Sequence, residues 1–144
     1  MKKQNLNDII LFQLDKTNKM AKQYSQSEFD RLKLDITVDQ WVLLKIIEEN
    51  GPLSQRELAA LSVRDPASIT RTLDLMEKKS WINRESIPGN RRQYNIQLSE
   101  DGKKFVKTNM KMIKKHRLKS TNGFNKEELE LLKNMLKKIQ DNMF

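Results

Sequence analysis

The chain has no cysteine and a single histidine, His116, which excludes several kinds of site. Without thiols there is no disulfide framework, thiolate metal site or thiol redox switch, and one imidazole cannot build a histidine metal cluster. We therefore expect no metal and no cofactor. Long apolar runs are also missing, since no stretch approaches the roughly 18 apolar residues of a membrane-spanning helix or forms a secretion signal. We expect a cytoplasmic protein with no membrane partner.

Recognisable signatures of catalysis are missing too. No glycine-rich phosphate loop follows a strand-like run, and no nucleophile stands in a known catalytic motif. The acidic pairs at 48–49 and 127–128 lie at predicted helix ends, where capping explains them. We therefore expect no catalytic residues and no enzyme activity.

What the chain does have is positive charge. Its 144 residues suffice for a single domain with a core. Lys and Arg number 28 against 19 Asp and Glu, which gives a formal net charge of +9. Such an excess indicates a polyanionic partner, and the placement of the charge decides how much the excess means.

The first half of the chain is predicted to be helical. Apolar residues at steps of three and four indicate a helix from Leu6 to about Asp30. A capping box at Thr37–Gln40 begins a second helix through WVLLKIIEEN, which Gly51 and Pro52 end with a left-handed cap. We expect this second helix to be the centre of the core.

A helix-turn-helix candidate follows. A capping box at Ser54–Glu57 begins a short helix, and Asp65 followed by Pro66 begins another after a turn of about three residues. Two short helices joined this tightly are typical of a helix-turn-helix. The residues of the first short helix that should face the core are Leu58, Ala59 and Leu61.

The second half of the chain predicts a hairpin and further helices. WINRES and QYNIQL are strand-like runs around an IPGN turn, so they should pair with the arginines at 91 and 92 near the tip. Ser99 caps a long lysine-rich helix, and Asn125 caps a last helix with an apolar seam. This element order predicts a mainly α chain with a small β-hairpin wing, that is, a winged helix-turn-helix joined to further helices.

The helix from Pro66 has the pattern of a DNA-recognition helix. Ile69, Leu73 and Met76 share one side, and the other side carries short or polar residues. Short side chains let a helix enter the major groove, and a hairpin tip carrying arginine suits the negative potential of the minor groove. The candidate DNA-binding residues are Ser54, Gln55, Arg64, Pro66, Ala67, Ser68, Thr70, Arg71, Asn90, Arg91 and Arg92.

QRELAALSVRDPASITRTLDLMEKKSWINRE and GNRRQYNIQLSEDGK resemble the helix-turn-helix and wing of the MarR family of dimeric winged-helix regulators. The resemblance is specific over about residues 54–102. The wing of that family commonly carries Asp-x-Arg, and here the triplet is Asn90-Arg91-Arg92. Arg92 matches the minor-groove arginine of the family, while Asn90 replaces the aspartate.

The resemblance implies a division of the chain and a function. Residues 37–98 would form the DNA-binding lobe, and residues 1–36 and 99–144 a helical dimerisation region. Double-stranded DNA with a pseudo-palindromic operator and a second copy of the chain are the implied partners of a repressor. The implied dimer-interface residues are Leu6, Ile10, Leu129, Leu132, Leu136 and Ile139.

A small lipophilic or aromatic effector is a further implication of the resemblance. Phe12, Met20, Tyr24 and Trp41 could line a pocket for it, although ordinary core packing explains each of them as well. The alternative function is a nucleic-acid-binding or architectural winged helix without sequence preference or effector, which the charge alone permits. Affinity for duplexes of scrambled sequence separates the two.

Overall fold

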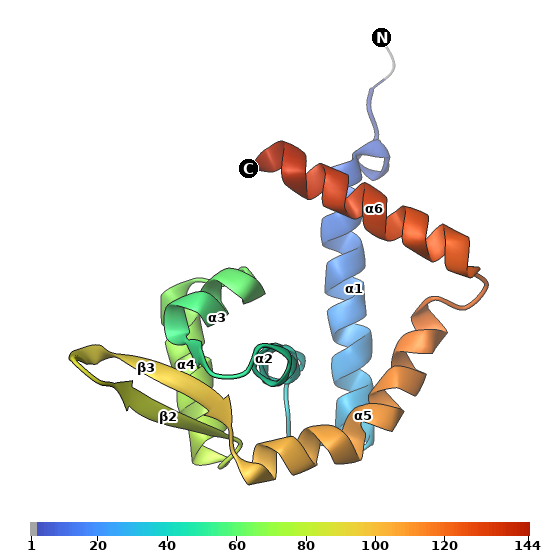
Figure 1. The fold of residues 1–144 in the computed structure, drawn as a ribbon. Helices are drawn as coiled ribbons and strands as arrows, with labels where there is room; N and C mark the ends of the chain where they lie inside the picture. The colour runs from blue at the N-terminus through green and yellow to red at the C-terminus, as the bar shows by residue number, and fades with distance from the viewer. Residues whose placement is uncertain (1–2) are drawn as a thin grey trace. The chain divides into compact units, whose positions relative to one another are not determined.

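The computed structural model describes residues 3–144, with the backbone alone for residues 90–93. The chain divides into two compact units, Met1–Met110 and Lys111–Phe144, which are described separately. Figure 1 shows the elements: η1 Leu6–Asp8, α1 Ile10–Arg31, α2 Val38–Asn50, β1 Leu53–Ser54, α3 Gln55–Ser62, α4 Pro66–Lys78, β2 Ile82–Ile87, β3 Asn90–Leu98, α5 Glu100–Ser120 and α6 Lys126–Met143. The predicted fold class, mainly helical with a small β wing, is confirmed.

The first helix begins later than predicted. Leu6–Asp8 form a 3-10 turn, whose cap is the side chain of Asn5 accepting a hydrogen bond from the Asn7 backbone N–H at 3.0 Å. Ile9 is extended, with φ −89° and ψ 120°, so α1 starts at Ile10. The apolar spacing runs on unbroken across this break, which is why spacing alone did not reveal it.

The predicted starts of α2, α3 and α4 are confirmed because each depends on a local hydrogen bond. Both halves of the capping boxes at Thr37 and Ser54 are present, and Asp65 accepts from the Ser68 backbone N–H at 2.9 Å. Gly51 ends α2 with φ 71° and ψ −156°. Its φ is positive, as predicted, but this ψ lies outside the left-handed helical region.

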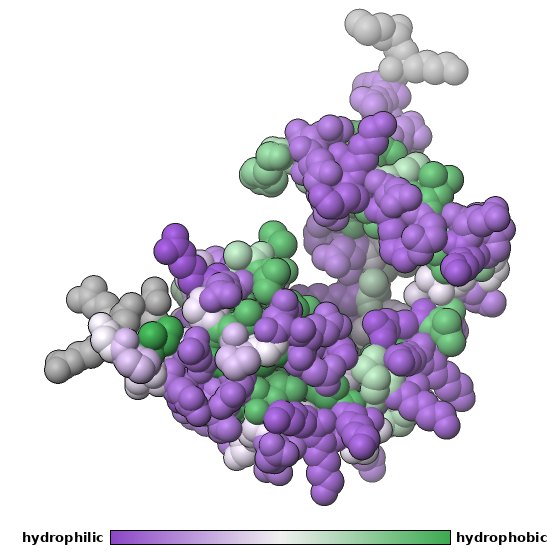
Figure 2. Space-filling view, viewed as in Figure 1, coloured by the Kyte–Doolittle hydropathy of each residue, from purple (hydrophilic) through white to green (hydrophobic). Residues whose placement is uncertain are grey.

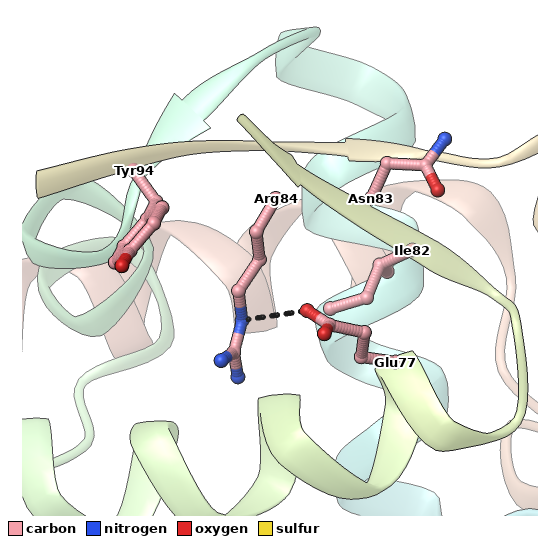
Figure 3. Close-up of a pocket in the computed structure, with 5 residues that line it drawn as sticks. All are labelled: Glu77, Ile82, Asn83, Arg84 and Tyr94. Atoms are coloured by element: carbon pink, nitrogen blue, oxygen red, sulfur yellow. Dashed lines mark ion pairs between the residues drawn. The ribbon is translucent and has the colours of Figure 1, made fainter. Parts of the chain in front are cut away.

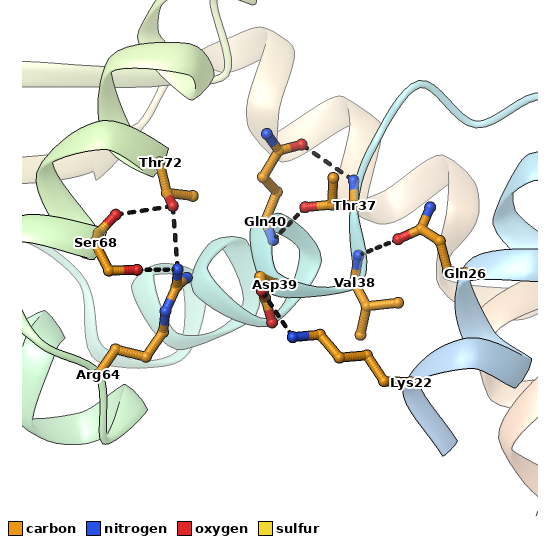
Figure 4. A network of polar contacts seen from close by, with 9 residues as sticks. All are labelled: Lys22, Gln26, Thr37, Val38, Asp39, Gln40, Arg64, Ser68 and Thr72. Atoms are coloured by element: carbon orange, nitrogen blue, oxygen red, sulfur yellow. Dashed lines mark hydrogen bonds and ion pairs between the residues drawn. The ribbon is translucent and has the colours of Figure 1, made fainter. Parts of the chain in front are cut away.

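A hydrogen bond and an ion pair join the last turns of α1 to the first turn of α2 (Figure 4). Gln26 Oε1 accepts a hydrogen bond from the Val38 backbone N–H at 3.0 Å, and Lys22 Nζ lies 3.0 Å from Asp39 Oδ2. The first contact satisfies one of the free amides of the first turn of α2. The exposed ion pair adds little to stability by comparison.

A small antiparallel sheet has the order β1-β3-β2. The hairpin register runs from Ile82 opposite Leu98 to Ser86 opposite Tyr94, and a bulge follows between Ser86 and Ile87. β1 pairs Leu53 with Ile96. β1 was not predicted, because a strand of two residues has no period to detect.

The core of the first unit lies where α2, α3, α4 and the sheet meet. The largest fully buried side chains include Leu43, Leu44, Ile47, Leu58, Ile69, Leu73, Met76, Ile82, Ile96 and Val106. The predicted inward face of α3 is wrong at Leu61, which is 52% exposed. Leu58, Ala59 and Ser62 set the inner side of this short helix, and Leu61 points roughly 110° away from it at 100° per residue.

The joint between α4, β2 and α5 is tightly packed. Ser99 Oγ donates to the Ser80 carbonyl and accepts from the Gly102 backbone N–H at 3.0 Å, so it caps α5 and holds the end of α4. A Cβ at Gly102 would lie 2.1 Å from the Trp81 carbonyl oxygen, so this close approach requires glycine. The Trp81 ring packs on Phe105 with centroids 4.8 Å apart.

The second unit contains the predicted last helix. Asn125 forms a full capping box, with its side chain accepting from the Glu128 backbone N–H at 2.8 Å. No residue of α6 is buried, and Leu131, Leu132 and Met135 are exposed.

On the face drawn in Figure 2, hydrophilic side chains cover most of the surface and apolar groups appear in patches. Within the described residues, no helix has the length and apolar character needed to cross a membrane.

Candidate nucleic-acid interface

The helix-turn-helix is built from α3 and α4. Val63 ends α3 in the left-handed conformation, with φ 54° and ψ 44°, and α4 starts at Pro66 under the Asp65 cap. Ile69, Leu73 and Met76 are fully buried. The opposite side carries the short or polar residues expected there, and they are exposed: Ala67, Thr70, Arg71, Asp74 and Lys78.

The hydroxyl groups of α4 are already engaged within the protein. Thr70 Oγ1 donates to the Pro66 carbonyl at 3.0 Å, and Thr72 Oγ1 donates to the Ser68 carbonyl at 3.0 Å. A carbonyl oxygen has no proton to give, so each threonine proton is committed. A free hydroxyl can both donate to and accept from base edges, but in this structure Thr70 offers only lone pairs.

Gln55, the first residue of α3, reaches across to α4. Its Nε2 donates to Thr70 Oγ1, a contact between residues on the two helices of the motif. Gln55 is half-buried and Thr70 is exposed. Ser54, its neighbour, is occupied by capping, since its Oγ accepts from the Glu57 backbone N–H at 3.1 Å.

Arg64 turns inward onto α4, as Figure 4 shows. Its Nη2 donates to Ser68 Oγ and to Thr72 Oγ1, the latter at 3.3 Å, and its Nη1 is buried with no hydrogen-bond partner among the described residues. The predicted DNA-binding residues Arg64 and Ser68 are thus brought together, with their polar atoms directed at each other. Arg71 is exposed and has neither a hydrogen bond nor an ion pair within the described part of the chain.

The amino end of α4 has a local negative charge. Pro66 and Ala67 are exposed there, as a groove-reading helix requires. However, the Asp65 carboxylate already takes the Ser68 amide, so this end is not an empty anion site. A phosphate approaching here would meet that carboxylate, which favours contacts further along the helix.

An ion pair that the sequence did not reveal anchors the wing to α4 (Figure 3). Arg84 Nη2 lies 2.8 Å from Asp74 Oδ1. Its Nε lies 3.3 Å from Glu77 Oε2, which is the contact drawn in Figure 3. The Arg84 side chain is 18% exposed, whereas both carboxylates are about half exposed. The sequence carried no local signal, because the partners lie on a helix and a strand with a turn between them. The open cavity beside them, of about 390 Å³, is lined by Glu77, Ile82, Asn83, Arg84 and Tyr94.

The wing residues Asn90, Arg91 and Arg92 belong to β3 by their backbone. Their side chains lie outside the described part of the structure. The turn before them, at Pro88 and Gly89, is at the end of the hairpin as predicted, with Gly89 at φ 82°. The tip therefore has the backbone that a wing needs.

The candidate effector residues do not share a described cavity. Trp41 is 6% exposed and packs against Phe105 with ring centroids 6.4 Å apart, so it is a core residue. Phe12 and Tyr24 are half-buried, and Met20 is 59% exposed. A second cavity, of about 300 Å³, is lined by Ile47, Glu48, Gly51, Pro52, Gln97, Leu98 and Lys103.

The dimer-interface candidates present apolar surface within their own units. Leu6 and Ile10 are 55% and 61% exposed on the first unit. Leu132 is 42% exposed on α6. The remaining candidates, all half-buried on the same helix, are Leu129, Leu136 and Ile139.

Comparison with known proteins agrees with this geometry. Residues 36–94 match the sequence profile of the MarR family. E. coli MarR, solved as a cysteine-to-serine mutant complexed with operator DNA, is 22% identical with a TM-score of 0.82, covering 95% of this chain and 99% of that one. The S. aureus MepR–DNA complex is 22% identical with a TM-score of 0.80, covering 92% and 96%.

A MarR protein from Peptoclostridium difficile is 19% identical with a TM-score of 0.84, covering 99% of this chain and 92% of that one. Two further solved structures with this fold are transcriptional regulators, one of them SlyA. Residues 36–94 therefore match the MarR family, and the chain as a whole has the fold of the solved MarR structures.

Proposed function

We propose that the protein is a homodimeric, sequence-specific DNA-binding regulator of transcription that acts as a repressor. The observation that carries this proposal is α4, whose buried side of Ile69, Leu73 and Met76 supports an exposed side of short and polar residues. Such a helix can enter the major groove. The formal net charge of +9 supplies long-range attraction to the phosphate backbone.

The dimer is supported by apolar surface on η1, α1 and α6. Leu6 and Ile10 are more than half exposed, and α6 buries none of its residues. A two-fold dimer would cover such surfaces against their own copies. It would also present both recognition helices to one face of a duplex, with half-sites about one helical turn, ~34 Å, apart.

Selection of preferred duplexes from a random pool tests the proposal directly. We expect a pseudo-palindromic consensus with one half-site per protomer. Equal retention of all sequences would instead support the alternative of a nucleic-acid-binding or architectural protein without sequence preference. A promoter reporter carrying the selected site then tests repression, since an occupied site excludes other proteins from that stretch of duplex.

Arg71 is the exposed arginine that α4 offers to a base or a phosphate. If it reads a guanine edge, Arg71→Ala should lose about 1–3 kcal/mol of binding and relax preference at one position per half-site. If the loss is the same on every sequence, Arg71 contacts a phosphate. The two results assign its role.

The wing arginines, Arg91 and Arg92, are proposed to contact the minor groove or the flanking backbone. Replacing both with alanine should weaken binding to all sequences and keep most of the preference read by α4. Each lost phosphate contact should lower the slope of log affinity against log salt by about 0.9. Unaltered affinity and slope would show that the wing is a solvated hairpin.

We also propose that a small lipophilic or aromatic effector weakens DNA binding by favouring a dimer in which the recognition helices no longer match the groove spacing. Phe12, Met20 and Tyr24 are its candidate contacts, because they keep exposed or half-buried surface. Trp41 is buried, so it offers almost no surface for an effector to contact directly. A ligand can release DNA only through its differential affinity for the two shapes, so tight binding without release would refute this mechanism.

A further inference from the structure

We infer that Thr70 is a specificity-positioning residue that orients the side-chain amide of Gln55 to read adenine in each half-site. The inference rests on the proposed DNA-binding function. It adds to that function the base that is recognised and the separate roles of the two residues. Gln55 would contact the base, and Thr70 would hold Gln55. The two residues come from different helices, so their pairing depends on the geometry of the whole motif.

The hydrogen bonds of Thr70 set the orientation of the amide. Thr70 Oγ1 has one proton, and it lies 3.0 Å from the Pro66 carbonyl, which can only accept. Toward Gln55 the hydroxyl must therefore accept. The atom of Gln55 that faces Thr70 has to be Nε2, because Oε1 would place lone pairs against lone pairs.

Once its orientation is fixed, the Gln55 amide has one donor and one acceptor left for a base. One N–H is used by Thr70, which leaves the other N–H and the Oε1 acceptor of Gln55. In the major groove adenine presents the complement, an N7 acceptor beside an N6 donor, and a glutamine amide can pair with both. Guanine presents two acceptors, so Oε1 would face another acceptor and the pair would be lost.

The neighbouring hydroxyls bind Arg64 instead of Gln55. Ser68 Oγ accepts from Arg64, and Thr72 gives its proton to the Ser68 carbonyl while also accepting from Arg64. Ser68 and Thr72 are half-buried, in contrast to the exposed Thr70. Gln55, on α3, and Arg71, on α4, are therefore the candidates for reading bases near this end of α4.

The test uses the full-length protein and the duplex selected from a random pool, with each position of one half-site changed in turn. Gln55→Ala should reduce discrimination for adenine by about 5- to 150-fold at a single position. Thr70→Val, which keeps the shape but removes the hydroxyl, should reduce it by about 3- to 10-fold at the same position. Thr70→Ser should restore most of that loss, because the hydroxyl returns.

The double variant carries the strongest prediction. If Thr70 acts only through Gln55, Gln55→Ala combined with Thr70→Val should match Gln55→Ala alone to within about twofold at that position. Thr108→Val, an exposed threonine on α5, controls for the substitution itself and should change no position. Gln55→Ala changes only the first residue of α3, so the base that Gln55 reads stays measurable even if Thr70→Val unfolds.

Several results would overturn the inference. They are loss of preference at different positions for the two variants, an equal loss on all sequences for Gln55→Ala, and a preferred base other than adenine at the affected position. An equal loss would mean that Gln55 contacts a phosphate. Failure of the unmodified protein to select any sequence would instead refute the proposed function, and it would be seen before any variant is made.

Discussion

Removing the two sides of the Arg84 ion pair should have unequal consequences for stability. Arg84→Met leaves Asp74 and Glu77 without a partner, but their side chains are 53% and 50% exposed and can be rehydrated. Exposed pairs contribute about 0–1 kcal/mol, so we expect a loss of about 1 kcal/mol in the free energy of unfolding. Methionine keeps an unbranched side chain in the cavity that Arg84 lines together with Ile82 and Tyr94.

Removing the carboxylates is the harsher change. Asp74→Ala with Glu77→Ala leaves a guanidinium that is 18% exposed, with a buried Nε that has no hydrogen-bond partner in the described structure. A buried charge left unpaired costs about 3–5 kcal/mol. Partial exposure and the higher helix propensity of alanine reduce this to about 2 kcal/mol.

Urea denaturation of the two variants measures the difference, with the midpoint compared at constant slope. Lys133→Met, which breaks an exposed pair with Glu130 on α6, is the matched control and should cost less than about 0.5 kcal/mol. If Arg84→Met destabilises the protein as much as the double alanine variant does, the asymmetry argument is wrong. If neither variant has an effect, the pair does not anchor the wing.

Three further changes should be measurable in solution. Ser80 has φ 62°, so Ser80→Gly should raise the free energy of unfolding by about 0.5–1 kcal/mol, while Ser80→Ala should bring no such gain. Gly102→Ala should cost about 3 kcal/mol, because its Cβ would meet the Trp81 carbonyl oxygen at 2.1 Å; a thermal melt unchanged from the unmodified protein would contradict the close approach. Glutamate at both Leu132 and Leu136 should dissociate the proposed dimer in sedimentation equilibrium, and a stable folded monomer of the unmodified protein would refute the dimer.

The parts of the fold that depend on neighbouring residues could be predicted from the sequence. The caps at Thr37, Ser54 and Asn125 are confirmed because the side chain and its amide partner are three residues apart. The buried stripe of α4 is confirmed because a long helix with a regular apolar period has one way to face a core. In α3 the same reasoning misplaced Leu61. Two helical turns contain too few residues to show whether a residue at the edge of the apolar face is buried.

The candidate site was harder to predict, because its geometry is set by contacts between elements. Position and polarity selected Gln55, Thr70 and Arg64 as DNA-binding candidates, but the sequence could not show that Gln55 bonds to Thr70 or that Arg64 turns inward. Arg84 was missed altogether. Its partner Asp74 is 10 residues earlier on another element, and no local pattern links a strand arginine to a helix carboxylate.

Because β1 pairs with β3 far from the hairpin tip, the length of the wing can change without moving the helix-turn-helix formed by α3 and α4. Leu53 and Ser54 pair with Ile96 and Asn95, far from the hairpin tip, and Ser54 also caps α3. Inserting one residue on each side of the tip would extend the wing by about 3.3 Å without shifting that pairing. During divergence, tip length could thus adjust the span of flanking duplex that is covered, while the half-site preference stays as it was. The tip is the place where such length variation is tolerated, and β1 is the place where a one-residue slip would disrupt both functions at once.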